Sequence, residues 1–84
     1  MGYLKNDGTE IEFKDMDGKE VYIGSRIYPP EGGQELRVAW FQPDYPEIGD
    51  VLMCQQVNDL DAFSSITQEV CRKYWRIAPE KVDA

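Results

Sequence analysis

The sequence predicts an α+β fold, in which an antiparallel meander of four to five strands is followed by one C-terminal amphipathic helix packed on one face of the sheet. Turn residues divide the first 57 residues into short segments, most of which alternate apolar and polar side chains as half-buried strands do. From residue 60 onward, apolar residues recur at steps of three or four, which is typical of an amphipathic helix. Eighty-four residues are too few for two hydrophobic cores, so we expect a single domain, 1–84.

The first two expected strands form a hairpin. Residues 3–5 are followed by Asn-Asp-Gly at 6–8, residue types that tolerate positive φ and favour a tight turn. Residues 9–14 then place Ile11 and Phe13 on one side and charged side chains on the other. One face of this hairpin is therefore expected to meet water.

Three further strands are expected in the middle of the chain. A second turn at 15–19 leads into residues 20–28, and the prolines that follow end this strand because they cannot donate a ladder hydrogen bond. Residues 36–42 read as a central strand and residues 51–57 as a fourth main strand. The expected apolar faces are Val21, Ile23 and Ile27, then Leu36, Val38 and Trp40 with Phe41 on the opposite face, and then Val51, Met53 and Val57.

The helix is expected near the C-terminus, with four to five turns. Asn58 or Asp59 would cap its first amides, and Pro79 would end it. The middle of its apolar stripe, from Phe63 to Val70, is expected to be buried against the sheet. The whole stripe comprises Leu60, Phe63, Ile66, Val70, Tyr74 and Ile77.

Composition limits the possible functions. Sixteen acidic residues against nine basic ones give a net charge of -7, which opposes direct binding to nucleic-acid phosphate or to anionic lipid. The N-terminus has no basic segment followed by an apolar run, and no stretch approaches the ~18 apolar residues of a membrane span. We therefore expect a cytoplasmic protein without a membrane partner.

Reactive side chains are few. The chain has no histidine, and Cys54 and Cys71 do not form a CxxC pair, so we expect reduced thiols, no metal and no cofactor. Asp15, Asp17 and Gly18 match part of a calcium loop, but the third acidic position and the closing glutamate are missing, which favours a simple turn. We expect no enzymatic activity, with a carboxylate-based or cysteine-based enzyme as a minor alternative.

Acidic and aromatic residues of the first half indicate a binding surface. Residues 1–50 carry eleven acidic and five basic side chains, and strand alternation directs several of the acids towards solvent around one hairpin. Large aromatic side chains project opposite to the apolar faces of their own strands, more than one helix can cover. The expected partner-binding residues are Glu10, Glu12, Asp15, Asp17, Glu20, Tyr22, Tyr28 and Phe41.

These features predict a small non-enzymatic module that binds a protein partner with a basic surface. Its concrete form would be an inhibitor that occludes a nucleic-acid-binding site, as DNA mimics and phage-encoded, anti-CRISPR-like inhibitors of bacterial defence do. The alternative is a structural or assembly subunit that forms a homodimer or larger homo-oligomer through a strand edge or the exposed aromatics.

Overall fold

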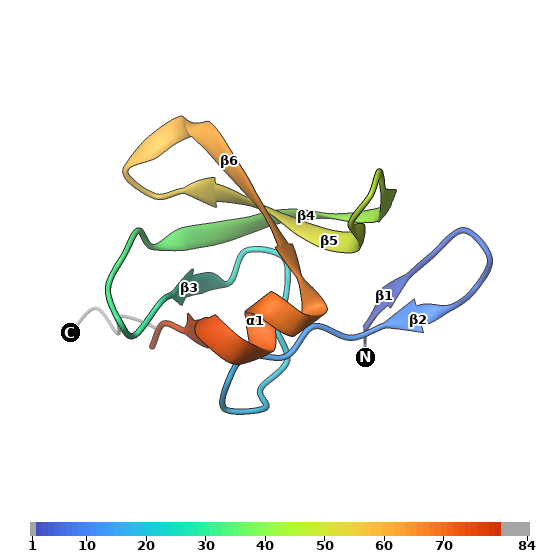
Figure 1. Ribbon diagram of the computed structural model, residues 1–84, viewed down its shortest axis with the longest axis horizontal. Coiled ribbons are helices and arrows are strands. Elements are labelled where there is room, and N and C mark those ends of the chain that lie inside the picture. The colour runs from blue at the N-terminus through green and yellow to red at the C-terminus, as the bar shows by residue number, and fades with distance from the viewer. Residues whose placement is uncertain (1, 80–84) are drawn as a thin grey trace.

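A computed structural model describes residues 2–79 and confirms the α+β class. A five-stranded antiparallel sheet, a two-stranded sheet and one helix make up the regular structure (Figure 1). The elements are β1 (Tyr3–Leu4), β2 (Glu10–Ile11), β3 (Arg26–Tyr28), β4 (Leu36–Tyr45), β5 (Gly49–Gln56), β6 (Asp59–Thr67), α1 (Gln68–Tyr74) and β7 (Arg76–Ile77).

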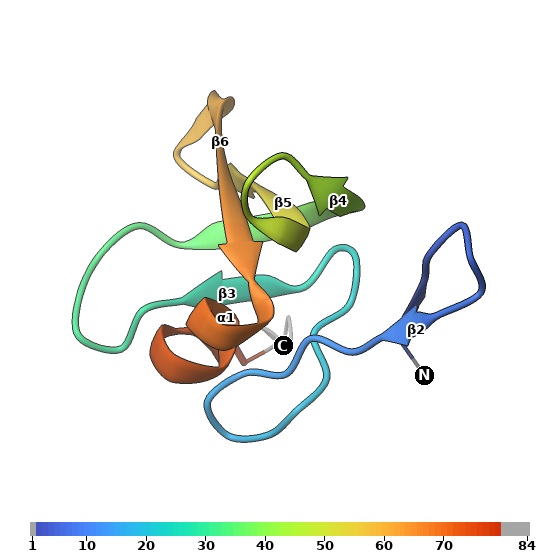
Figure 2. The same ribbon diagram turned by 45° about the vertical axis from the view of Figure 1, so that its right-hand side comes forward.

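The large sheet has the order β6-β5-β4-β3-β7. Strands β4, β5 and β6 form a meander of long strands, after which the chain passes through α1 and returns as β7 to pair with β3. Ile27 pairs with Ile77 in that last contact, so residues 50 positions apart in the sequence meet at the edge of the sheet. The β1–β2 hairpin forms a separate two-stranded sheet and projects beside the large sheet, as the turned view shows (Figure 2).

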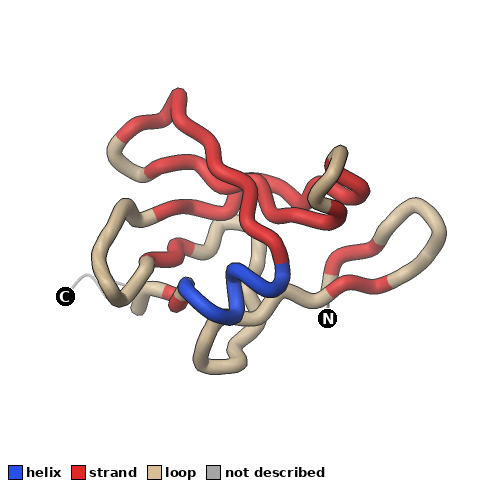
Figure 3. The backbone as a smooth tube through the Cα atoms, viewed as in Figure 1, coloured by secondary structure: helices blue, strands red, loops and turns tan. Residues whose placement is uncertain are grey.

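The core lies on one face of the β4–β5–β6 meander, which we call the inner face. It is covered by the segment between β2 and β3, which is mostly irregular backbone (Figure 3). That segment contributes Phe13 and Val21, and α1 contributes Cys71. The buried cluster is Phe13, Val21, Ile27, Leu36, Val38, Leu52, Cys54, Ile66 and Cys71.

The expected N-terminal hairpin is confirmed, although only Glu10–Ile11 of the strand expected at 9–14 forms β2. Tyr3 pairs with Ile11 in an antiparallel register, and Lys5 N–H donates to the Thr9 carbonyl at 2.8 Å across the turn. Gly8 has a φ of 87°, a left-handed conformation that glycine adopts at little cost. The turn chemistry of residues 6–8 was therefore sufficient to predict this element.

The expected strand at 20–28 is wrong over most of its length, because only Arg26–Tyr28 forms β3. Ser25 N–H donates to the Tyr22 carbonyl at 3.0 Å, and Gly24 takes a φ of 91°, so a turn interrupts the segment. Ile23, expected on the apolar face, lies in that turn with 52% of its surface exposed.

Strand β4 confirms the expected central strand, but its alternation reverses halfway. Val38 pairs with Cys54 and Trp40 pairs with Met53, so Ala39 is an extra residue in the ladder, a β-bulge. One extra residue turns every following side chain to the other face. Trp40, expected to be buried, is consequently exposed, and Phe41, expected to project outward, packs against the core.

The expected long C-terminal helix is wrong. Residues 59–67 form β6, which pairs with β5 over most of its length, and α1 is confined to the seven residues Gln68–Tyr74. The side chain of Thr67, not of Asn58 or Asp59, caps the helix by accepting from Val70 N–H at 3.2 Å. Within residues 2–79, no helix has the length and apolar character that crossing a bilayer requires.

The residues of the predicted helical stripe therefore lie in different environments. Ile66 is buried because it faces inward from β6 beside Leu52, whereas Leu60, Phe63 and Val70 remain exposed. Pairing with β5 satisfies the backbone groups of β6 that face β5, and it extends a sheet whose inner face is already being buried. The three-and-four spacing was thus coincidental along these residues.

Candidate functional site

Acidic side chains from two segments meet on one surface beside the core. Val21 N–H donates to the Phe13 carbonyl at 2.8 Å, and Lys14 and Glu20 form an antiparallel bridge, so residues 10–14 run alongside residues 20–22. Phe13 and Val21 point inward, and their sequence neighbours therefore point outward. The resulting surface, which we call the acidic patch, consists of Glu10, Glu12, Glu20 and Tyr22.

Hydrogen bonding sets the protonation of two members of the acidic patch. The Tyr22 hydroxyl donates to the Glu20 carboxylate, and this bond lowers the pKa of Glu20. The same bond, with the nearby charges of Glu20 and Glu12, raises the pKa of Tyr22. Glu20 is therefore held ionised and Tyr22 neutral, with 54% of the tyrosine exposed to solvent.

Lys14 and the Gly2 amide contact two of the carboxylates in this surface. Lys14 Nζ is 3.7 Å from a carboxylate oxygen of Glu12, and both side chains are about half exposed. Glu10 accepts a hydrogen bond from the Gly2 amide at 2.7 Å, which does not neutralise its charge. The acidic patch therefore combines the carboxylates of Glu10, Glu12 and Glu20 with an aromatic ring beside them.

Asp15 does not belong to this surface, contrary to expectation. It is fully buried, and one carboxylate oxygen accepts the amides of Asp17 and Lys19, both at 2.9 Å. The other oxygen accepts the amide of Ile77 at 3.0 Å. Asp15 therefore fastens the 15–19 turn to β7, and no partner can contact its carboxylate in this structure.

Asp17 lies at the exposed tip of that turn, but its carboxylate is paired. Its Oδ2 atom is 2.8 Å from Nε of Arg76. Both carboxylates were predicted to face a partner. Instead, Asp15 is a buried hydrogen-bond acceptor and Asp17 forms an ion pair with Arg76. Among residues 2–79, no group of three metal-ligating side chains is placed to hold a metal ion.

Two of the aromatic residues expected at the interface lie elsewhere. Phe41 stacks on Tyr3 with ring centroids 5.1 Å apart and meets the edge of Phe13 at 6.0 Å, so it is a packing residue and not a surface anchor. Tyr28 is half-buried on β3, where its hydroxyl raises the pKa of Arg76 through a hydrogen bond.

Sequence reasoning missed a second exposed surface, on the face of the meander opposite the core. Trp40 and Phe63 lie there with ring centroids 5.6 Å apart, 42% and 46% exposed. Trp40 was expected in the core, and Phe63 was expected on a buried helix. The structure has a turn at residues 57–58, where Asn58 is the one turn-favouring residue type, so little in the sequence indicated that a strand follows β5.

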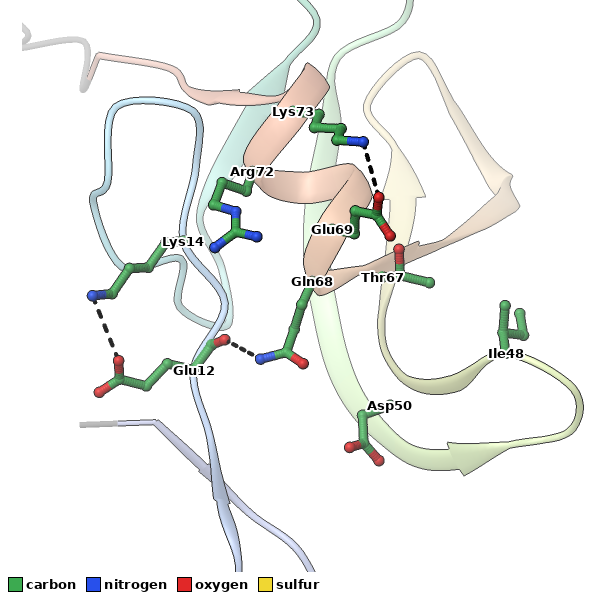
Figure 4. Close-up of a pocket in the computed structure, with 9 residues that line it drawn as sticks. All are labelled: Glu12, Lys14, Ile48, Asp50, Thr67, Gln68, Glu69, Arg72 and Lys73. Atoms are coloured by element: carbon green, nitrogen blue, oxygen red, sulfur yellow. Dashed lines mark hydrogen bonds and ion pairs between the residues drawn. The ribbon is translucent and has the colours of Figure 1, made fainter.

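A groove of about 740 Å³ adjoins the acidic patch (Figure 4). Glu12 and Lys14 form one wall, and the exposed side of α1 forms the opposite wall, where Gln68 donates to the Glu12 carbonyl at 2.7 Å. Three acids and three bases line the groove, so it has no charge preference of its own. The lining residues are Glu12, Lys14, Ile48, Asp50, Thr67, Gln68, Glu69, Arg72 and Lys73.

The two cysteines lie away from this groove. Both are buried, unpaired thiols, and burial is the main cause that raises the pKa of each to about 12. A thiol held protonated in this way is a poor nucleophile near neutral pH.

No protein-family description, curated protein or solved structure matches this chain. Function must therefore be inferred from the chain's own residues.

Proposed function

We propose that this protein is a binding module whose acidic patch occupies a basic site on a partner protein. In its concrete form it is an inhibitor that occludes a nucleic-acid-binding surface, because a row of carboxylates offers a basic groove the same charge as a phosphate backbone. The observation that carries this proposal is the convergence of Glu10, Glu12 and Glu20 from two segments around the half-exposed ring of Tyr22.

The physical argument rests on ionisation and on exposure. Glu20 stays charged because Tyr22 donates to it, so the surface does not lose that charge by protonation near neutral pH. Tyr22 adds apolar area and a polar tip, the combination enriched at binding hot spots. The net charge of -7 on the chain steers association with a basic surface.

Affinity capture with matched charge reversals tests this proposal. Glu12→Lys with Glu20→Lys should abolish capture of the partner, whereas Glu31→Lys with Glu47→Lys changes net charge equally at exposed sites elsewhere and should preserve it. Heparin should displace the captured partner, because heparin and the acidic patch would compete for the same basic site on that partner. Equal capture by the two double variants, or capture indifferent to heparin, contradicts the proposal.

The alternative is an assembly subunit that forms homo-oligomers, for which the exposed rings of Trp40 and Phe63 supply an apolar contact. Sedimentation across a range of concentrations separates the two hypotheses. An inhibitor awaiting a foreign partner remains monomeric, whereas an assembly subunit gains mass with concentration.

A further inference from the structure

The outer face of the β4–β5–β6 meander carries an aromatic surface at the margin of the sheet. In the sheet register Trp40 lies beside Met53, and Met53 lies beside Ser65 of β6. Phe63, also on β6, pairs with Gln55 and brings its ring into contact with that of Trp40. We call Trp40, Met53 and Phe63 the outer aromatic surface.

Strand β6 is the edge of the sheet next to this surface. It is nine residues long and is the terminal strand of the order β6-β5-β4-β3-β7 (Figure 1). In an antiparallel edge strand, every second residue directs its N–H and C=O away from the neighbouring strand. Within residues 2–79, β5 is the sole strand that pairs with β6. The Leu60 carbonyl accepts from the Gln55 side chain at 2.7 Å and Asp61 N–H donates to the Asp59 carboxylate at 3.2 Å, so the backbone groups that remain for a further strand are the outward ones of residues 62–67.

The charge of this half of the sheet is one-sided. Residues 38–71 contain six acidic side chains and no lysine or arginine. Lys5 reaches Asp44 and Asp50 at 3.0 and 3.2 Å, and Lys73 reaches Glu69 at 2.9 Å, so three of the six carboxylates contact a lysine and share two positive charges. Two of the remaining three, Asp59 and Asp61, are exposed on β6 itself.

We propose that β6 and the outer aromatic surface form a docking site for an extended, basic segment of a partner protein, which adds to the sheet as a sixth strand. Backbone groups of β6 would bind the segment's main chain, and Asp59 and Asp61 would pair with its lysine or arginine side chains. Trp40 and Phe63 would receive aliphatic stems or a guanidinium group across their exposed ring faces. This site is separate from the acidic patch and does not depend on the proposed function.

Charge favours such a segment over a second copy of this chain. A second β6 would bring the same two aspartates and no cation, on a molecule that also carries a net charge of -7. The cation of β4, Arg37, is separated from β6 by the width of β5 and cannot serve as the counter-charge along the edge. A foreign strand with alternating basic residues supplies the charge that the edge lacks.

Titration with synthetic peptides, followed by NMR and amide hydrogen exchange, tests the proposal. The probe is a peptide of about eight residues in which lysine alternates with valine. It should slow exchange at alternate amides of β6 and shift the indole signal of Trp40. A peptide with glutamate in place of lysine, and one with alternate amides N-methylated, should each bind at least about tenfold more weakly.

Matched protein variants locate the site. Asp59→Lys with Asp61→Lys, and separately Phe63→Ala, should each weaken the lysine peptide about tenfold or more. Glu31→Lys with Glu47→Lys, and Tyr74→Ala on the exposed side of α1, should leave its affinity unchanged. Glu12→Lys with Glu20→Lys should also leave the peptide affinity unchanged. The proposal for β6 and the proposal for the acidic patch can therefore be disproved independently.

Several results overturn the proposal. These are equal binding of the glutamate or the N-methylated peptide, the absence of binding by any peptide, and protection that appears at residues 10–22 instead of β6. Protection of β6 that rises with protein concentration alone would identify a second copy as its occupant, which also overturns the proposal. Because the peptide controls leave the protein unaltered, the test does not depend on whether Phe63→Ala folds.

Discussion

The two faces of the β4–β5–β6 meander are built by the same three strands but are covered to different extents. On the outer face Val51 is fully buried, whereas the outer aromatic surface is not covered. Leu52 and Cys54 on the inner face are fully buried, whereas Trp40 and Phe63 on the outer face are almost half exposed. Both faces carry large apolar side chains, so composition does not distinguish them. What distinguishes them is the covering segment, because Phe13, Val21 and Cys71 arrive from outside the meander and pack on one face.

A chain of 84 residues has little material for a second layer. The segment between β2 and β3 and the short helix α1 cover the inner face, and no described segment of comparable size lies over the outer aromatic surface. Small domains bury a smaller fraction of their surface than large ones do. The uncovered face is therefore the part of this sheet that is available to a partner.

Truncation of one side chain on each face is the strongest way to break the comparison. Leu52→Ala should lower the free energy of unfolding by about 2–5 kcal/mol, because it leaves a cavity in a fully buried site. Phe63→Ala should cost less than about 1 kcal/mol, since its ring is already in contact with water. Urea unfolding with a constant m-value measures both. A loss for Phe63→Ala as large as that for Leu52→Ala would mean that the outer face is covered.

Asp15 tests the role of the segment that covers the inner face, because its carboxylate joins that segment to β7. Asp15→Asn should cost about 1–3 kcal/mol, since the new amide group would direct its own N–H at the Ile77 amide, which then loses its acceptor. Asp17→Asn, two residues away at an exposed ion pair with Arg76, should cost at most about 1 kcal/mol. Thermal unfolding compares the two, and hydrogen exchange at Ile77 should accelerate in Asp15→Asn alone. Equal losses would contradict the fastening role.

Alkaline pH should weaken the inner face selectively. Burial, followed by the charge of Cys71, raises the pKa of Cys54 from 9.0 to about 12. Between pH 9 and about 12 this thiol ionises in the unfolded chain but stays protonated in the folded chain. Its contribution to the free energy of unfolding is therefore complete below pH 9 and is lost as pH rises through this range. Tyr3, whose pKa is also raised to about 12 mainly by burial, acts in the same direction.

Urea midpoints between neutral pH and about pH 11 measure this loss. Cys54→Ala should flatten the pH dependence, whereas Phe63→Ala on the outer face should leave its slope unchanged. A slope unaffected by Cys54→Ala would show that this thiol does not contribute to the alkaline loss.

The sequence alone predicted the elements that depend on interactions between residues close together in the chain. Asn-Asp-Gly at 6–8 produced the β1–β2 hairpin, and residues 36–42 and 51–56 lie in β4 and β5. The face expected for the second of these strands is wrong, because Leu52 and Cys54, not Val51 and Met53, join the core cluster. In the acidic patch, alternation correctly placed Glu10, Glu12 and Tyr22 outward. In each of these cases the relevant interactions lie within a few residues or follow directly from strand period.

The sequence-based predictions were wrong where contacts between distant segments determine the structure. The spacing of apolar residues at 60–77 fitted a helix, yet pairing with β5 made residues 59–67 a strand. The bulge at Ala39, which exchanges the positions of Trp40 and Phe41, leaves no signal in the sequence. Asp15 reads as a solvent-facing turn acid, but its third hydrogen bond comes from Ile77, 62 residues further along the chain.

By itself, then, the sequence determined the α+β class, the N-terminal hairpin, the two central strands and the excess of negative charge. The tertiary structure alone decided which face of the meander is covered, which carboxylates reach solvent and where the C-terminal segment pairs. The physical reason is that turn chemistry and alternation act over a few residues, whereas burial and edge pairing depend on segments that meet only when the chain is folded.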